Sequence, residues 1–216
     1  MDQDPVSPGA PESKISQADV QLIIAEYDRL KGLEASEWNT YHSRFNFFMT
    51  VVLALLGGYV TLATATSQFV SPGSPVPEIL GTIVLVWGVL TFIGLVDSSY
   101  TIRHYINALN WLQKFFIDKN LTIRKYLYFR KESNPDLYRK TGWLEGLLAE
   151  YALRGSPKMV LALVNSAIIT GLAAQTLYLR GAPANTSLAV GIMIGVASGI
   201  AHVIYVKLIY RRKYIA

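Results

Sequence analysis

Four long windows of the sequence are almost free of charged side chains, and they constrain the fold more than any other feature. They cover about residues 45–66, 79–96, 159–179 and 188–206. A helix of roughly 20 apolar residues crosses the hydrocarbon core of a bilayer, and it satisfies its backbone hydrogen bonds internally. Only 16% of the 216 residues are charged, against about 25% in soluble domains. We therefore predict an all-α, polytopic membrane protein with four transmembrane helices.

The polar segments around these windows divide the chain into four regions. Residues 1–15 contain three prolines and no apolar core, so we predict a disordered leader. Residues 16–97 are predicted to form an amphipathic cytoplasmic helix, weakly interrupted at Gly32, and then the first transmembrane hairpin. Residues 98–157 are predicted to be a cytoplasmic helical segment. Residues 158–216 are predicted to form the second transmembrane hairpin and a basic tail.

The distribution of Lys and Arg predicts the orientation of the chain. Nineteen of the twenty Lys and Arg residues lie in the N-terminal, central and C-terminal polar segments, and Arg180 alone lies in a loop on the other side. The loop at residues 67–78 holds three prolines and no basic residue, and we predict a tight external loop without helix. The positive-inside rule then places both termini in the cytoplasm. We predict a multi-pass protein of the cell membrane, either a plasma membrane or a bacterial inner membrane.

Small residues form helical stripes in two of the windows. Gly191, Gly195 and Gly199 recur at intervals of four, so they lie on one face of the fourth span. Gly57 and Gly58 lie near the middle of the first span. Small residues let transmembrane helices approach one another closely. We therefore predict that these five glycines are helix-packing positions.

Polar side chains within the spans are the candidate functional residues. Ser198 and His202 share the face of the glycine stripe in the fourth span, and Asn165 and Thr170 lie in the third span. An ionisable side chain within a span is costly unless it faces protein or water. Two interpretations of His202 stay open. It is either a pore-lining or proton-responsive group, or the partner in an interhelical hydrogen bond that only stabilises packing.

Basic and aromatic residues are interleaved in the central segment between residues 124 and 131. This pattern fits either a surface for nucleic acid or nucleotides, or a belt at the depth of the lipid headgroups. We favour the lipid belt, and we expect no nucleic-acid partner. The predicted headgroup contacts are Arg124, Lys125, Arg130, Lys131, Arg211, Arg212 and Lys213.

The sequence contains no recognisable catalytic or metal-binding constellation. The three histidines, His42, His104 and His202, are widely separated, and no two of them fall at metal-ligand spacing with a carboxylate. The chain also has no cysteine, no glycine-rich phosphate loop and no serine elbow. We therefore expect a protein that is not an enzyme and that has no catalytic residue, cofactor or metal site.

A pattern in the first part of the chain resembles small bacterial membrane proteins. Glu26-Tyr27-Asp28-Arg29-Leu30 is followed by Arg44-Phe45-Asn46 at the entry to the span that holds Gly57-Gly58. With a cytoplasmic helix before a transmembrane hairpin, this plan loosely resembles the SLATT-type effectors of bacterial conflict systems. Those effectors have two spans, whereas four are predicted here. The resemblance implies pore formation after nucleotide signalling, and hence a nucleotide or a cytoplasmic protein as a candidate ligand.

Three functions compete on these observations. An oligomeric channel or pore-forming effector, gated through its cytoplasmic helices, fits the small size, the short external loops and the repeated small-residue faces. The alternative is a membrane scaffold or a partner subunit of a larger complex. A small-solute transporter fits less well, because no span is broken around a polar midplane cluster. We expect a homo-oligomer in a lipid bilayer, since four helices enclose little lumen.

Overall fold

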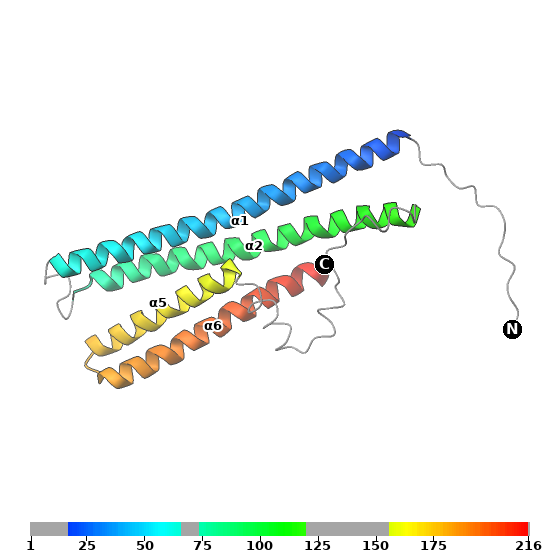
Figure 1. The fold of residues 1–216 in the computed structure, drawn as a ribbon. Coiled ribbons are helices and arrows are strands. Elements are labelled where there is room, and N and C mark those ends of the chain that lie inside the picture. Colours follow the sequence, from blue (N-terminus) through cyan, green and yellow to red (C-terminus); the bar gives the residue numbers. More distant parts are fainter. Residues whose placement is uncertain (1–16, 66–73, 120–155, 216) are drawn as a thin grey trace, which may run out of the picture.

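The computed structural model describes residues 17–65, 74–119 and 156–215, and these residues form four helices (Figure 1). The helices are α1 (Gln17–Ala65), α2 (Val76–Lys119), α5 (Pro157–Leu179) and α6 (Ala184–Ile215). Each of the four is long and apolar enough to cross a membrane. The prediction of an all-helical chain with four candidate membrane-spanning helices is therefore confirmed. The predicted leader at residues 1–15 and the basic-aromatic stretch at residues 124–131 lie outside the described residues.

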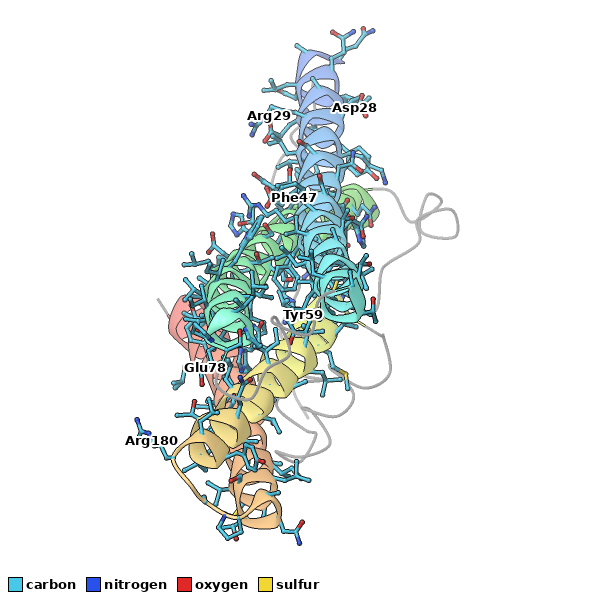
Figure 2. The ribbon with its side chains drawn as sticks, turned by 90° about the vertical axis from the view of Figure 1, so that its left-hand side faces the viewer. Asp28, Arg29, Phe47, Tyr59, Glu78 and Arg180 are labelled. Carbon is cyan, nitrogen blue, oxygen red and sulfur yellow. The ribbon has the colours of Figure 1, made fainter. Side chains whose placement is uncertain are left out.

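The helices are arranged so that α2 lies between α1 and α5, while α6 packs on α5 (Figure 1). The end of α1, the start of α2 and the turn between α5 and α6 all lie at one end of the unit. At the other end α1 and α2 project together beyond the two shorter helices. Figure 2 shows Asp28 and Arg29 on this projecting part of α1, whereas Glu78 and Arg180 lie toward the opposite end.

Helix α1 runs without a break through Gly32, where a weak interruption was expected. A single glycine within a helix costs only about 1 kcal/mol, and the flanking residues Leu30 and Glu34 are both buried. Because α1 has 49 residues, it is roughly 70 Å long at a rise of about 1.5 Å per residue. Its length exceeds the hydrocarbon thickness of about 30 Å more than twofold.

Helix α2 begins at Val76, inside the segment that was predicted to be a loop without helix. Pro77 lies in the first turn of α2, where backbone N–H groups have no partner within the helix. Proline therefore starts this helix and does not prevent it. The Val76 amide donates instead to the Ser74 hydroxyl at 3.4 Å. Helix α2 then continues to Lys119 as a single helix of 44 residues.

The core lies where α1, α2, α5 and α6 meet, and its largest fully buried apolar side chains are Phe48, Leu95, Val96, Leu161 and Val206. Many of the other large apolar side chains on the four helices are exposed, among them Leu53, Leu90, Leu163 and Met193. Outward-facing apolar surface of this extent is stable in lipid and unfavourable in water. The distribution fits a multi-pass membrane protein.

Both ends of α5 are defined by local sequence. Ser156 caps its first turn, because the Ser156 hydroxyl accepts a hydrogen bond from the Met159 amide at 3.4 Å. At the other end the chain turns sharply at Gly181, whose φ of +90° is readily adopted by glycine. These two signals fix α5 at Pro157–Leu179, close to the predicted span at residues 159–179.

Candidate functional site

The glycine stripe of α6 lies directly against α5. A Cβ atom at Gly191 would meet the Thr170 carbonyl oxygen at 2.7 Å. A Cβ atom at Gly195 would collide with the Thr170 hydroxyl and would lie 3.0 Å from the Ser166 carbonyl oxygen. At Gly199 the nearest atom is the Ser166 hydroxyl at 3.5 Å. The two helices are therefore closest at Gly191 and Gly195, and they diverge toward Gly199.

Beyond this stripe the structure brings Asn165 and His202 together. The Nδ2 atom of Asn165 lies 3.5 Å from Nε2 of His202, and Nδ1 of His202 lies 2.8 Å from the Ser198 carbonyl oxygen. A carbonyl oxygen only accepts hydrogen bonds, so Nδ1 carries a proton and donates it to Ser198. In the neutral ring Nε2 is then an acceptor for the Asn165 amide. Asn165 itself is fully buried.

Helix α2 completes this site with Gly88 and Phe92, which the sequence analysis did not select. A Cβ atom at Gly88 would collide with Oδ1 of Asn165 and would lie 3.2 Å from the Phe48 ring. The Phe92 ring meets the His202 ring in a T-shaped contact with centroids 4.6 Å apart. Gly81 and Gly88 are seven positions apart and therefore lie on one face of α2. This spacing is the signal that could have identified the close approach of α2 to α5.

The remaining candidates lie in other places. Thr170 donates from its hydroxyl to the Ser166 carbonyl oxygen at 2.9 Å, and it packs under the glycine stripe away from His202. Gly57 and Gly58 are exposed, and no described atom lies within 4 Å of a Cβ atom built at either position. Of the predicted headgroup contacts, Arg211, Arg212 and Lys213 lie in the last turns of α6. Arg124, Lys125, Arg130 and Lys131 lie outside the described residues, and a role in lipid binding stays a prediction for all seven.

A second polar junction joins α1, α2 and α5 four residues before the first predicted span. The Tyr41 hydroxyl hydrogen-bonds the Ser99 side chain and accepts from the backbone N–H of Lys158. Lys158 lies in the first turn of α5, where this N–H has no partner within the helix. Burial raises the pKa of Tyr41 to about 12, and the two hydrogen bonds oppose that rise. Tyr41 is therefore neutral at physiological pH.

We expect Tyr41→Phe to lower the free energy of unfolding by about 1–2 kcal/mol, because it leaves the Lys158 amide unpartnered at a buried position. Thermal unfolding in detergent micelles measures the change. Tyr178→Phe is the matched control, since Tyr178 is exposed, and it should leave the melting temperature unchanged. Equal melting temperatures for Tyr41→Phe and the wild-type chain would contradict this role.

The polar groups of this site are suited to hydrogen bonding and proton exchange. Within the described ranges, no group of three or more His, Asp or Glu side chains is arranged to hold a metal ion. The polar atoms that come together are one imidazole, one carboxamide and backbone carbonyls, which exchange hydrogen bonds and protons. No protein-family model, curated protein or solved structure matches this chain.

Proposed function

We propose that the protein is a homo-oligomeric membrane channel whose subunits surround a common pathway with the uncovered face of α1. The observation that carries the proposal is the composition of this face. Its side chains are small or polar along the length of the span, although no other helix of the same chain packs against them. The face consists of Asn46, Thr50, Ala54, Gly57, Thr61 and Thr64, and all six residues are exposed.

This face lies opposite the packed side of α1. At about 100° per residue, its residues fall on the far side of the helix from Tyr41, Phe48 and Val52, which are buried. The Thr50 and Thr61 hydroxyls donate to backbone carbonyl oxygens of α1, at 2.9 and 2.8 Å. A hydroxyl group that donates its proton to the backbone in this way can still accept hydrogen bonds from water through its oxygen atom. A face of this kind suits either contact between helices or the wall of an aqueous pathway.

A pathway between subunits is favoured over one within a subunit, because the interior of a single unit is filled. Phe48 from α1, Leu95 from α2, Leu161 from α5 and Val206 from α6 all have at most 2% exposure. A water-filled lumen therefore requires several chains.

The continuous helices suggest how cytoplasmic signals reach the pathway. Beyond the span, α1 and α2 stay packed through Leu30, Ile106 and Leu109, which are buried. Nε2 of Gln113 donates to the Tyr27 hydroxyl across the same contact at 3.5 Å. We call this paired part of α1 and α2 beyond the span the extension. A ligand or protein that moves the extension would move the α1 face as well. The basic residues favour an extension that lies in the cytoplasm.

Exposed apolar residues on the extension favour scaffolding as a second candidate function. Leu22, Ile24 and Trp111 lie outside the predicted spans, with exposures of 70%, 51% and 72%. Side chains of this kind contribute to protein interfaces. The scaffold hypothesis predicts that the protein copurifies with a stable cytoplasmic partner and conducts no ions.

Ion flux through single-cysteine variants in proteoliposomes tests the channel. The chain has no native cysteine, so Thr50→Cys and Thr61→Cys each introduce a single reactive site. A charged, water-soluble thiol reagent should modify both and block most of the flux. Val86→Cys is the matched control, because Val86 is also exposed but belongs to α2, on a surface that the proposal assigns to lipid, and the flux of this variant should not change.

Two outcomes would contradict the channel. Complete absence of flux across ionic conditions and candidate nucleotides would leave the scaffold as the better hypothesis. If the reagent blocks flux equally in all three cysteine variants, the block does not depend on the α1 face. That result would contradict a pathway lined by this face. Oxidative cross-linking of Gly57→Cys into dimers should accompany flux, since adjacent subunits would meet near this residue.

A further inference from the structure

The Asn165–His202 contact leaves one buried polar atom without a partner. Asn165 has no exposed surface, and its Oδ1 atom accepts no hydrogen bond. This oxygen faces the backbone of α2 at Gly88, so closely that a Cβ atom there would collide with it. A buried acceptor without a donor typically costs about 1–3 kcal/mol. The neutral arrangement therefore holds an unused acceptor next to an imidazole.

We propose that Nε2 of His202 is a proton-binding site inside the helical unit, and that the Asn165 carboxamide serves both forms of the ring. In the neutral form Nδ2 of Asn165 donates to Nε2. When Nε2 takes up a proton, the carboxamide turns by 180° and Oδ1 accepts from it. Nδ1 keeps its hydrogen bond to the Ser198 carbonyl oxygen in both forms, so the ring does not need to move.

Phe92 is the aromatic neighbour of the His202 ring. Phe92 is 2% exposed, and its ring centroid lies 4.6 Å from that of His202. A cation over the face of an aromatic ring, within about 6 Å of its centroid, is attracted by the ring quadrupole, whereas the edge of the ring carries the opposite sign. Reversal of the carboxamide also turns its NH₂ group toward α2 at Gly88. Proton uptake therefore changes the contact among α2, α5 and α6.

Each helix around the site contributes titratable or charged groups within a few turns. Tyr41 and Arg44 come from α1, and Arg44 donates to the Ser98 hydroxyl at 3.1 Å. The groups from the other helices are Asp97 on α2, Lys158 on α5, and Tyr205 and Lys207 on α6. Asn165 and Phe92 are the groups in direct contact with the ring.

Nitrogen NMR on His202 tests the site directly. The chain has three histidines, so the His42→Gln/His104→Gln background leaves His202 as the only imidazole. The full-length protein, labelled with ¹⁵N-histidine and reconstituted in lipid, should show a proton on Nδ1 alone at high pH. As the pH falls, Nε2 should gain a proton while the Nδ1 proton remains. A ring that stays singly protonated down to pH 5, or a neutral ring protonated at Nε2, would overturn the proposal.

Two substitutions at Asn165 separate the carboxamide's role from packing. Asn165→Leu keeps the size but removes the acceptor, and it should lower the ratio of doubly to singly protonated ring at least about fivefold at pH 5.5. Asn165→Asp keeps an acceptor and should raise that ratio. Gln175→Leu is the control, because it removes a carboxamide ten residues further along α5. The proposal fails if both Asn165 variants give the ratio of the wild-type chain.

Coupling of this proton to flux rests on the proposed channel, and the two can be tested separately. If the channel is correct, flux should change with pH over the range in which His202 titrates, and His202→Gln should remove that dependence. A pH-dependent ring without any flux would refute the channel and leave the proton site standing. Flux together with a His202 ring that never becomes doubly protonated would refute the proton site and leave the channel standing.

Discussion

Gly88→Ala should lower the free energy of unfolding by about 3 kcal/mol, one of the largest effects expected for a single methyl group in this chain. The added Cβ would collide with Oδ1 of Asn165 and would press on the Phe48 ring at 3.2 Å. Asn165 cannot move aside without losing its contact with His202, which lies on the opposite side of the carboxamide. The substitution therefore forces α2 away from α5 or breaks the polar contact. Thermal unfolding in micelles and the ¹⁵N spectrum of His202 report the two consequences.

Gly171→Ala is the matched control for Gly88→Ala. Gly171 lies within α5, and no described atom lies within 4 Å of a Cβ atom built there. Gly171→Ala should leave the free energy of unfolding of the protein unchanged or raise it slightly, because alanine is the better helix former. Adding Asn165→Ala to Gly88→Ala should restore part of the stability, since the smaller side chain makes room for the methyl group. If Gly88→Ala and Gly171→Ala behave alike, the close approach of α2 to Asn165 is wrong.

The apolar windows were sufficient to predict the four helices, because the thickness of a bilayer sets a length that the sequence displays directly. The third predicted span, residues 159–179, differs from α5 by two residues at its start. The helix boundaries outside the windows were harder to predict. Helices α1 and α2 continue far beyond the windows because they pack against one another through residues such as Leu30 and Ile106, which are buried. That stabilisation depends on a partner helix and is not visible in either segment alone.

The candidate site was predictable only in part, for the same reason. His202 and Asn165 were both selected as polar residues within apolar spans, but only the packing of α5 on α6 brings them to 3.5 Å. Gly88 was missed because its importance comes from the register of α2 against α5. Gly57 and Gly191 carry the same local signal, yet Gly57 is exposed while Gly191 is buried against α5. A small residue shows where a helix can approach and does not show which helix does.

The glycines of α6 should differ in their sensitivity to alanine, with Gly191 the most sensitive. A methyl group at Gly191 would lie 2.7 Å from the Thr170 carbonyl oxygen and 3.0 Å from the Cβ atom of Ala174. Neither atom can rotate away, because one belongs to the backbone and the other is fixed to it. Helices α5 and α6 must then separate along their whole contact. We expect Gly191→Ala to lower the free energy of unfolding by about 2–3 kcal/mol, as measured by thermal unfolding in micelles.

Gly195→Ala and Gly199→Ala provide graded comparisons on the same face of α6. At Gly195 the collision involves the Thr170 hydroxyl, which a rotamer change relieves, although the Ser166 carbonyl oxygen remains 3.0 Å away. Its cost should therefore lie between those of the other two positions, and Thr170→Ala should reduce it. At Gly199 the nearest atom is 3.5 Å away, an ordinary contact, so alanine should be tolerated. Equal effects at all three positions would mean that this face meets lipid and not α5, since lipid chains adapt to an added methyl group wherever it is placed.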